Sequence, residues 1–124
     1  MIYLTAPYWH KNKIIRAARF KATSELMGDL IKSGTEVFCD VVYIHTLLET
    51  NPNLEFEDLN WYLLLKPFRR FADSLGVYQL PGWEQDRLVN STHNYFALNG
   101  DKIQVWAPKL EHSTGPYLET WKNI

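Results

Sequence analysis

Two carboxylates, Glu84 and Asp86, follow a Pro-Gly turn and are the acidic side chains best placed to do chemistry. A carboxylate in a ligand site can act as a nucleophile and form a covalent intermediate. Either residue could instead sit in the first turn of a helix, where the helix dipole stabilises negative charge. The sequence leaves both roles open for both residues.

Aromatic side chains occur in two loops that could contribute to a ligand site. Pro7-Tyr8 follows the first apolar run, and Trp83 follows the Pro-Gly turn. A ring in such a position can stack on a base or close over a sugar, although Tyr8 could equally be a surface aromatic. Trp61, by contrast, is expected in the core, because an indole has a large area to bury.

Basic side chains offer a phosphate contact. Arg16 and Arg19 are three residues apart in a predicted helix and therefore share a face. A guanidinium suits bidentate phosphate binding, but a solvated basic face is the alternative. His45 could contact base or phosphate, or cap the next helix, and His10 could be a solvated loop residue that titrates near neutrality.

Composition limits the classes of function. The chain has 124 residues, which suits one domain, and a formal net charge of −1 without a basic block. This argues against binding to polymeric nucleic acid or to a membrane surface. No apolar run approaches a membrane span, and the N-terminus lacks the pattern of a signal peptide, so we expect a soluble, cytoplasmic protein.

The single cysteine and the remaining histidines make metal or disulfide chemistry improbable. Cys39 has no partner for an intramolecular disulfide and is expected to be buried. His93 and His112 show no metal-ligand spacing with neighbouring acids. We therefore expect no metal site.

The elements that must position these residues alternate between strand and helix. Residues 2–5 and 36–39 are short apolar runs that predict strands, and residues 12–32 show the spacing of an amphipathic helix that ends at Ser33-Gly34. Residues 2–39 thus predict a parallel βαβ unit. The remaining expectations are a loop leading into a short helix at 40–49, helix at 54–71 kinked or divided near Pro67, a strand at 74–80, a helix at 83–98, a strand at 102–106 and a tail or subunit arm at 107–124.

This alternation predicts an α/β fold: a flavodoxin/Rossmann-like doubly wound parallel sheet of about four to five strands with flanking helices. Ligands of such sheets bind beyond the carboxyl ends of the strands. Those ends are residues 5–10, 39–45 and 80–86, which hold most of the candidate residues.

Several motifs, in order, resemble one protein family. They are MIYLTAPY at the N-terminus, RAARF at 16–20, Ala72-Asp73, and LPGW at 80–83. Together they resemble nucleoside 2-deoxyribosyltransferase-like proteins, in particular a branch of unknown function, over residues 1–106. The resemblance implies that residues 1–106 form the family's domain.

The resemblance also implies a reaction. In the family, a glutamate attacks C1′ of a nucleoside or nucleotide, the base leaves, and the glycosyl-enzyme is resolved by a second base or by water. Asp86 falls on a family aspartate, but Thr92 falls on the nucleophile and Leu88 on a glycine. A threonine hydroxyl is a poor nucleophile without a base, and His93, its neighbour, points about 100° away on a helix. Glu84 or Asp86 could attack instead.

Two functions follow as alternatives. The first is an N-glycosidase or deoxyribosyltransferase that uses Asp86 or Glu84 and needs no cofactor. The second is a catalytically degenerate nucleotide-binding protein on the same fold, since function belongs to the site. The residues expected to contact the nucleoside or nucleotide are Pro7, Tyr8, Arg19, His45, Trp83 and Thr92. The resemblance further implies a homodimer or larger assembly, in which Pro116, Tyr117 and Trp121 could reach a neighbour's pocket.

Overall fold

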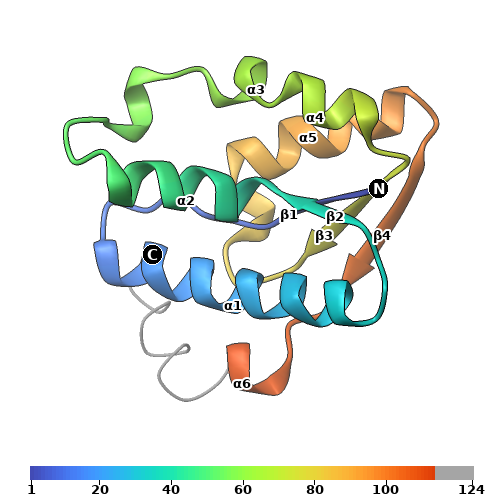
Figure 1. The fold of residues 1–124 in the computed structure, drawn as a ribbon, viewed down its shortest axis with the longest axis horizontal. Helices are drawn as coiled ribbons and strands as arrows, with labels where there is room; N and C mark the ends of the chain where they lie inside the picture. The colour runs from blue at the N-terminus through green and yellow to red at the C-terminus, as the bar shows by residue number, and fades with distance from the viewer. Residues whose placement is uncertain (114–124) are drawn as a thin grey trace.

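The computed structural model describes residues 1–113 and contains a four-stranded, all-parallel sheet flanked by helices (Figure 1). The strand order is β2-β1-β3-β4, and each neighbouring pair runs in the same direction. The strands are β1 (Ile2–Thr5), β2 (Val37–Cys39), β3 (Ser74–Tyr78) and β4 (Lys102–Trp106). The predicted doubly wound α/β fold is confirmed.

Helices connect the strands and cover the sheet. They are α1 (Lys13–Lys32), α2 (Asp40–Thr50), the 3-10 turn η1 (Phe56–Asp58), α3 (Trp61–Leu64), α4 (Lys66–Phe71), the 3-10 turn η2 (Trp83–Gln85), α5 (Arg87–Leu98) and α6 (Leu110–Ser113). Within residues 1–113, none of these helices is both long and apolar enough to cross a membrane. The expected arm residues Pro116, Tyr117 and Trp121 lie outside the described part of the chain.

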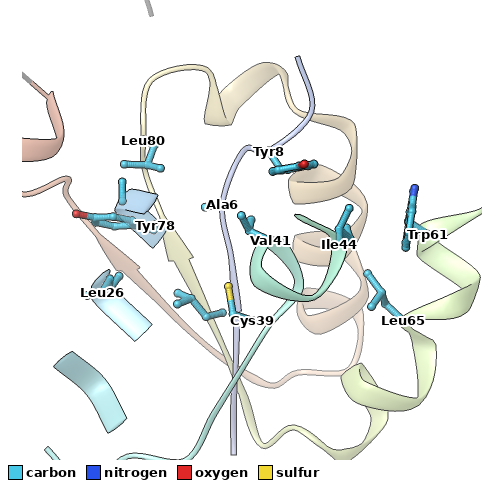
Figure 2. Packing of buried hydrophobic residues seen from close by; sticks show 12 residues of the cluster. Ala6, Tyr8, Leu26, Cys39, Val41, Ile44, Trp61, Leu65, Tyr78 and Leu80 are labelled. Atoms are coloured by element: carbon cyan, nitrogen blue, oxygen red, sulfur yellow. The ribbon is translucent and has the colours of Figure 1, made fainter. Parts of the chain in front are cut away.

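Alternation along β1 divides the core between the two faces of the sheet. Leu4 belongs to a cluster with Leu26 of α1, whereas Tyr3 belongs to a cluster with Phe96 of α5. Neighbouring residues of a strand point to opposite faces, so α1 and α5 cover opposite sides (Figure 1). Figure 2 shows the first cluster, which continues past the end of β1 to Tyr8 and Trp61.

A glycine in β3 makes room for an indole on the sheet. A Cβ at Gly76 would overlap the six-membered ring of Trp106, which lies on β4 two residues beyond Gln104, the partner of Gly76. Any side chain at this position would force the indole off the sheet. Gly76 therefore allows Trp106 to pack against the α1-side cluster.

Three helices differ from the sequence-based expectation. The helix expected over 54–71 begins later, because residues 54–60 contain only η1 and α3 starts at Trp61. The expected loop after β2 is wrong, because α2 begins at Asp40, directly after the strand. The expected continuous helix over 83–98 is also wrong, because η2 ends before Asp86 and α5 begins after it. The expected division near Pro67 is confirmed: α3 ends at Leu64, and Pro67 lies in the first turn of α4, where a missing N–H costs nothing.

Candidate functional site

A cavity of about 480 Å³ opens at the carboxyl edge of the sheet. It lies between the segment that follows β1, the segment that follows β3, and η1. Its lining residues are Tyr8, Trp9, His10, Arg19, Phe56, Glu57, Gly82, Gln85, Asp86, Arg87 and Leu88. This is the edge at which doubly wound sheets bind their ligands.

The LPGW motif forms the tight turn at one side of the cavity. The Trp83 N–H donates to the Leu80 carbonyl at 3.0 Å, and Gly82 has φ 96° and ψ −3°. These values define a type II turn with Pro81 and Gly82 at its centre, where the second position requires a positive φ. The turn brings the Gly82 backbone to the cavity wall and directs the chain into η2 and α5.

Asp86 ties the two strand-following segments together. Its Oδ2 accepts from the Val89 N–H at 2.9 Å, which makes it the N-cap of α5. The carboxylate also accepts from the backbone N–H groups of Tyr8 and Leu88. Burial raises the pKa of Asp86, while these N–H groups and the nearby Arg19 oppose that rise. Asp86 is therefore both a structural link and part of the cavity wall.

Arg19 reinforces the same link from α1. Its side chain is buried, Nη1 donates to the Trp9 carbonyl at 3.0 Å, and Nη2 donates to the Pro81 carbonyl at 3.4 Å. Burial lowers the pKa of Arg19, and the charge of Asp86 opposes this shift. Arg19 thus connects α1 to the segments after β1 and after β3.

Tyr8 and His45 form a buried pair behind the cavity. The Tyr8 Oη lies 2.9 Å from the His45 Nδ1, and the His45 ring stacks on Phe20 with centroids 4.1 Å apart. Burial raises the pKa of Tyr8 to about 12 and lowers the pKa of His45. The lowered pKa favours a neutral imidazole, so His45 does not provide a positive charge for a phosphate at neutral pH.

A stack of aromatic rings forms one wall. Trp9 lies parallel to Phe56 with centroids 4.6 Å apart, and Phe56 stacks in turn on Trp61 at 5.7 Å. The Arg16 guanidinium lies 4.6 Å from the Trp9 ring centroid. Sequence reasoning missed Trp9 and Phe56. Trp9 could have been found as the neighbour of Tyr8, but no periodicity in the segment around Phe56 marks it as a wall residue.

The structure brings some predicted residues to the cavity and places others elsewhere. Tyr8, Arg19 and Asp86 line it. Glu84 is exposed and does not line it, and Trp83 packs against the α5-side core cluster. Three further predicted contacts, Pro7, His45 and Thr92, are buried and also lie outside the lining.

Thr92 points into the core. Its exposed fraction is 0%, and its Oγ1 has no hydrogen-bond partner among residues 1–113. It lies on the same face of α5 as Val89 and Phe96, which belong to the α5-side core cluster. A hydroxyl in this position cannot reach a ligand in the cavity without a rearrangement of α5.

Asp40 is a buried carboxylate that sequence reasoning did not single out. Its Oδ2 accepts from Thr5 Oγ1 at 2.7 Å and from Tyr3 Oη at 3.2 Å, whereas its Oδ1 has no hydrogen-bond partner in the described part of the chain. Burial raises the pKa of Asp40 to about 7, and the charge of Asp86 adds to this rise. Its place directly after β2 was the available signal.

One group of possible metal ligands occurs within residues 1–113, where α6 packs on α1. It consists of Glu25, Glu111 and His112, and it does not line the cavity. The His112 Nε2 lies 2.7 Å from Glu25 Oε2, and its Nδ1 lies 2.6 Å from the Tyr78 Oη. These contacts hold residues of the expected C-terminal arm against α1 of the same chain.

Comparison with known proteins does not assign a family or a function to the chain. No model of a protein family matches the chain, and a search of curated proteins finds no match. The geometry of the cavity is therefore the basis for a functional proposal.

Proposed function

We propose that this protein binds a nucleoside or nucleotide in the cavity beside Asp86 and does not break its N-glycosidic bond. The resemblance of residues 1–106 to nucleoside 2-deoxyribosyltransferase-like proteins is part of this proposal. So are the cytoplasmic location and the homo-oligomeric state. Support comes from the position of the cavity at the carboxyl edge of a parallel sheet.

The burial of Thr92 carries the non-catalytic half of the proposal. This residue holds the position of the family nucleophile, yet its side chain is a hydroxyl that is fully buried in the core. Glu84, one substitute, is exposed and outside the cavity lining. Asp86, the other, caps α5 by accepting the Val89 N–H at 2.9 Å, so its carboxylate already has a structural role.

The lining of the cavity supports the nucleoside half. Tyr8, Trp9 and Phe56 supply an aromatic wall, and Gln85 supplies an amide that can hydrogen bond to a base edge. The volume lies within the range of about 300–1,000 Å³ that is usual for small-molecule sites. Arg87, an exposed cation at the start of α5, is suited to a 5′-phosphate.

Incubation with the deoxynucleosides and their 5′-monophosphates tests both halves. We expect a rise in melting temperature, because a ligand of the folded state stabilises it, and no free base by chromatography. Trp9→Ala should weaken binding by about tenfold or more through the loss of its wall contact. Glu84→Ala, in a neighbouring but exposed position, is the matched control and should bind like the wild type.

The outcomes separate three functions. Ligand binding without base release supports the proposal. Base release that disappears in Asp86→Asn would replace it with an N-glycosidase that uses Asp86. Neither a shift in melting temperature nor base release would reject a nucleoside ligand altogether.

A charge substitution tests the phosphate contact. Arg87→Gln should weaken monophosphates about tenfold and leave nucleosides unchanged, because only the monophosphates carry the group it would bind. Arg70→Gln removes the same charge from an exposed position outside the cavity and serves as the control. Equal effects of the two substitutions would remove Arg87 from the site.

A further inference from the structure

A second cavity of about 320 Å³ adjoins the first. The two share three lining residues, Tyr8, Trp9 and Phe56, so these side chains form a common wall. The wall is held in place from both ends: Trp9 stacks on Phe56, and the Tyr8 hydroxyl is bonded to His45. These contacts fix the position of the wall that separates the two cavities.

Positive charge is available on the far side of this wall. Lys13 and Arg16 line the second cavity, one turn apart on α1, and the first turn of α1 contains no acidic residue. The Arg16 Nη1 donates to the His10 carbonyl at 2.6 Å, which holds the guanidinium beside Trp9. Lys13 is exposed and forms no ion pair with any residue from 1 to 113.

The two acidic residues of the second cavity are engaged elsewhere. Glu55 accepts the backbone N–H of Asp58 in a capping box at the start of η1. Glu49 lies one turn after His45 on α2, and its carboxylate is 3.8 Å from the His45 Nε2. Neither carboxylate forms an ion pair with Lys13 or Arg16 among residues 1–113, so both cations remain available to an anionic group.

We propose that the ligand is a dinucleotide, that is, two nucleosides joined through phosphate, with one nucleoside in each cavity. The linking phosphate, attached on the 3′ side of the first nucleoside, would cross the shared wall and contact Lys13 and Arg16, both of which suit phosphate oxygens. The 5′ side of the first nucleoside would stay beside Arg87. The second nucleoside would pack on Leu48 and Leu54, which line the second cavity. This inference rests on the proposed function and specifies its substrate class.

Calorimetric titration with a nucleoside, its 5′-monophosphate and dinucleotides that contain it tests the inference. Occupation of both cavities should tighten dinucleotide binding by about tenfold or more over the monophosphate. Lys13→Gln should weaken the dinucleotide about fivefold and leave the nucleoside unchanged. Lys11→Gln, which removes an exposed lysine outside both cavities, should change neither.

A steric variant gives an independent check that does not depend on charge. Leu54→Trp places a larger side chain in the second cavity and should reduce dinucleotide affinity to that of the monophosphate, with nucleoside binding retained. A dinucleotide that binds no more tightly than the monophosphate would overturn the inference while leaving the proposed function intact. Equal effects of Lys13→Gln and Lys11→Gln would also overturn it. The absence of all nucleoside binding would reject both proposals.

Discussion

Asp40 is a buried carboxylate and Asp86 a half-buried one; both begin helices at the same edge of the sheet, but their surroundings differ. Asp86 accepts backbone N–H groups from two segments and lies near the Arg19 guanidinium. Asp40 accepts hydroxyl groups on one oxygen, and its other oxygen has no partner. Asp86 also lines the cavity, and Asp40 does not.

The difference shows how surroundings assign roles to one residue type. Donors and a cation favour the charged form of Asp86, which fits a residue that caps a helix and faces a ligand. A site that gives Asp40 few donors favours its neutral form and raises its pKa to about 7. We interpret Asp40 as a structural residue and Asp86 as part of the binding site.

The largest effect should come from removing Asp86. Asp86→Ala deletes the N-cap of α5 and the tie to the Tyr8 backbone, and should lower the free energy of unfolding by about 1–2 kcal/mol. Ligand affinity should fall by more than tenfold. Asp86→Asn retains a capping oxygen without the charge and should recover most of the stability but not the affinity. Urea denaturation measures the free energy of unfolding, and calorimetry measures ligand affinity. Equal recovery of both in Asp86→Asn would show that the charge of Asp86 does not contribute to binding.

The pH dependence of stability should distinguish Asp40. Its pKa rises from 3.8 to about 7 on folding, so between these values the folded state keeps a proton that the unfolded state releases. The free energy of unfolding should therefore fall as the pH rises through this window. Asp40→Asn should flatten this decline. Burial also raises the pKa of Asp86, so a smaller slope should remain. Urea denaturation at several pH values gives the slopes, and identical slopes for the two proteins would contradict the protonation of Asp40.

Thr92 extends the comparison to a buried hydroxyl without a partner. Thr92→Val preserves the shape of the side chain and removes the unpaired oxygen, so the free energy of unfolding should rise by up to about 1 kcal/mol. Ligand binding should not change, because Thr92 lies outside the cavity. Loss of binding or of any base-releasing activity in this variant would place the hydroxyl in the site and contradict its structural role.

Glu84 provides the smallest expected effect, as an exposed carboxylate next to the same turn. Glu84→Ala should change the free energy of unfolding by less than about 0.5 kcal/mol, as is usual for surface substitutions. Its ligand affinity should equal that of the wild type. A large effect on affinity, measured by the same titration, would show that the binding site extends beyond the cavity.

The strand-helix alternation was sufficient to predict the sheet. Residues 102–106 were predicted as a strand and form β4, because a short β-rich run with a preceding Asn-Gly turn has few alternatives. The start of α2 was missed because its N-cap is Cys39, whose side chain forms no capping hydrogen bond, so no capping residue precedes Asp40. The division at Asp86 was missed because an aspartate can be an N-cap or a first-turn residue, and only the N–H partners distinguish them.

The position of the candidate site could be predicted from the sequence, but only some of the residues that line it could be. Tyr8 and Asp86 could be placed near the cavity, because parallel strands bring their carboxyl ends to one edge. The buried position of Thr92 was available from its spacing relative to Val89 and Phe96, which marks the core face of a helix. Phe56 could not be predicted, because its approach to Trp9 depends on how η1 packs.

NMR observation of the tryptophan indole N–H groups during nucleotide titration tests the central claim most directly. Trp9 lines the cavity, whereas Trp106 packs over Gly76 on the sheet and serves as an internal control. Binding beside Asp86 should shift the Trp9 resonance in a saturable manner, leave Trp106 unchanged, and leave the nucleotide intact in the same tube. A Trp9 resonance that does not move at saturating nucleotide, or the release of free base during the titration, would contradict the account.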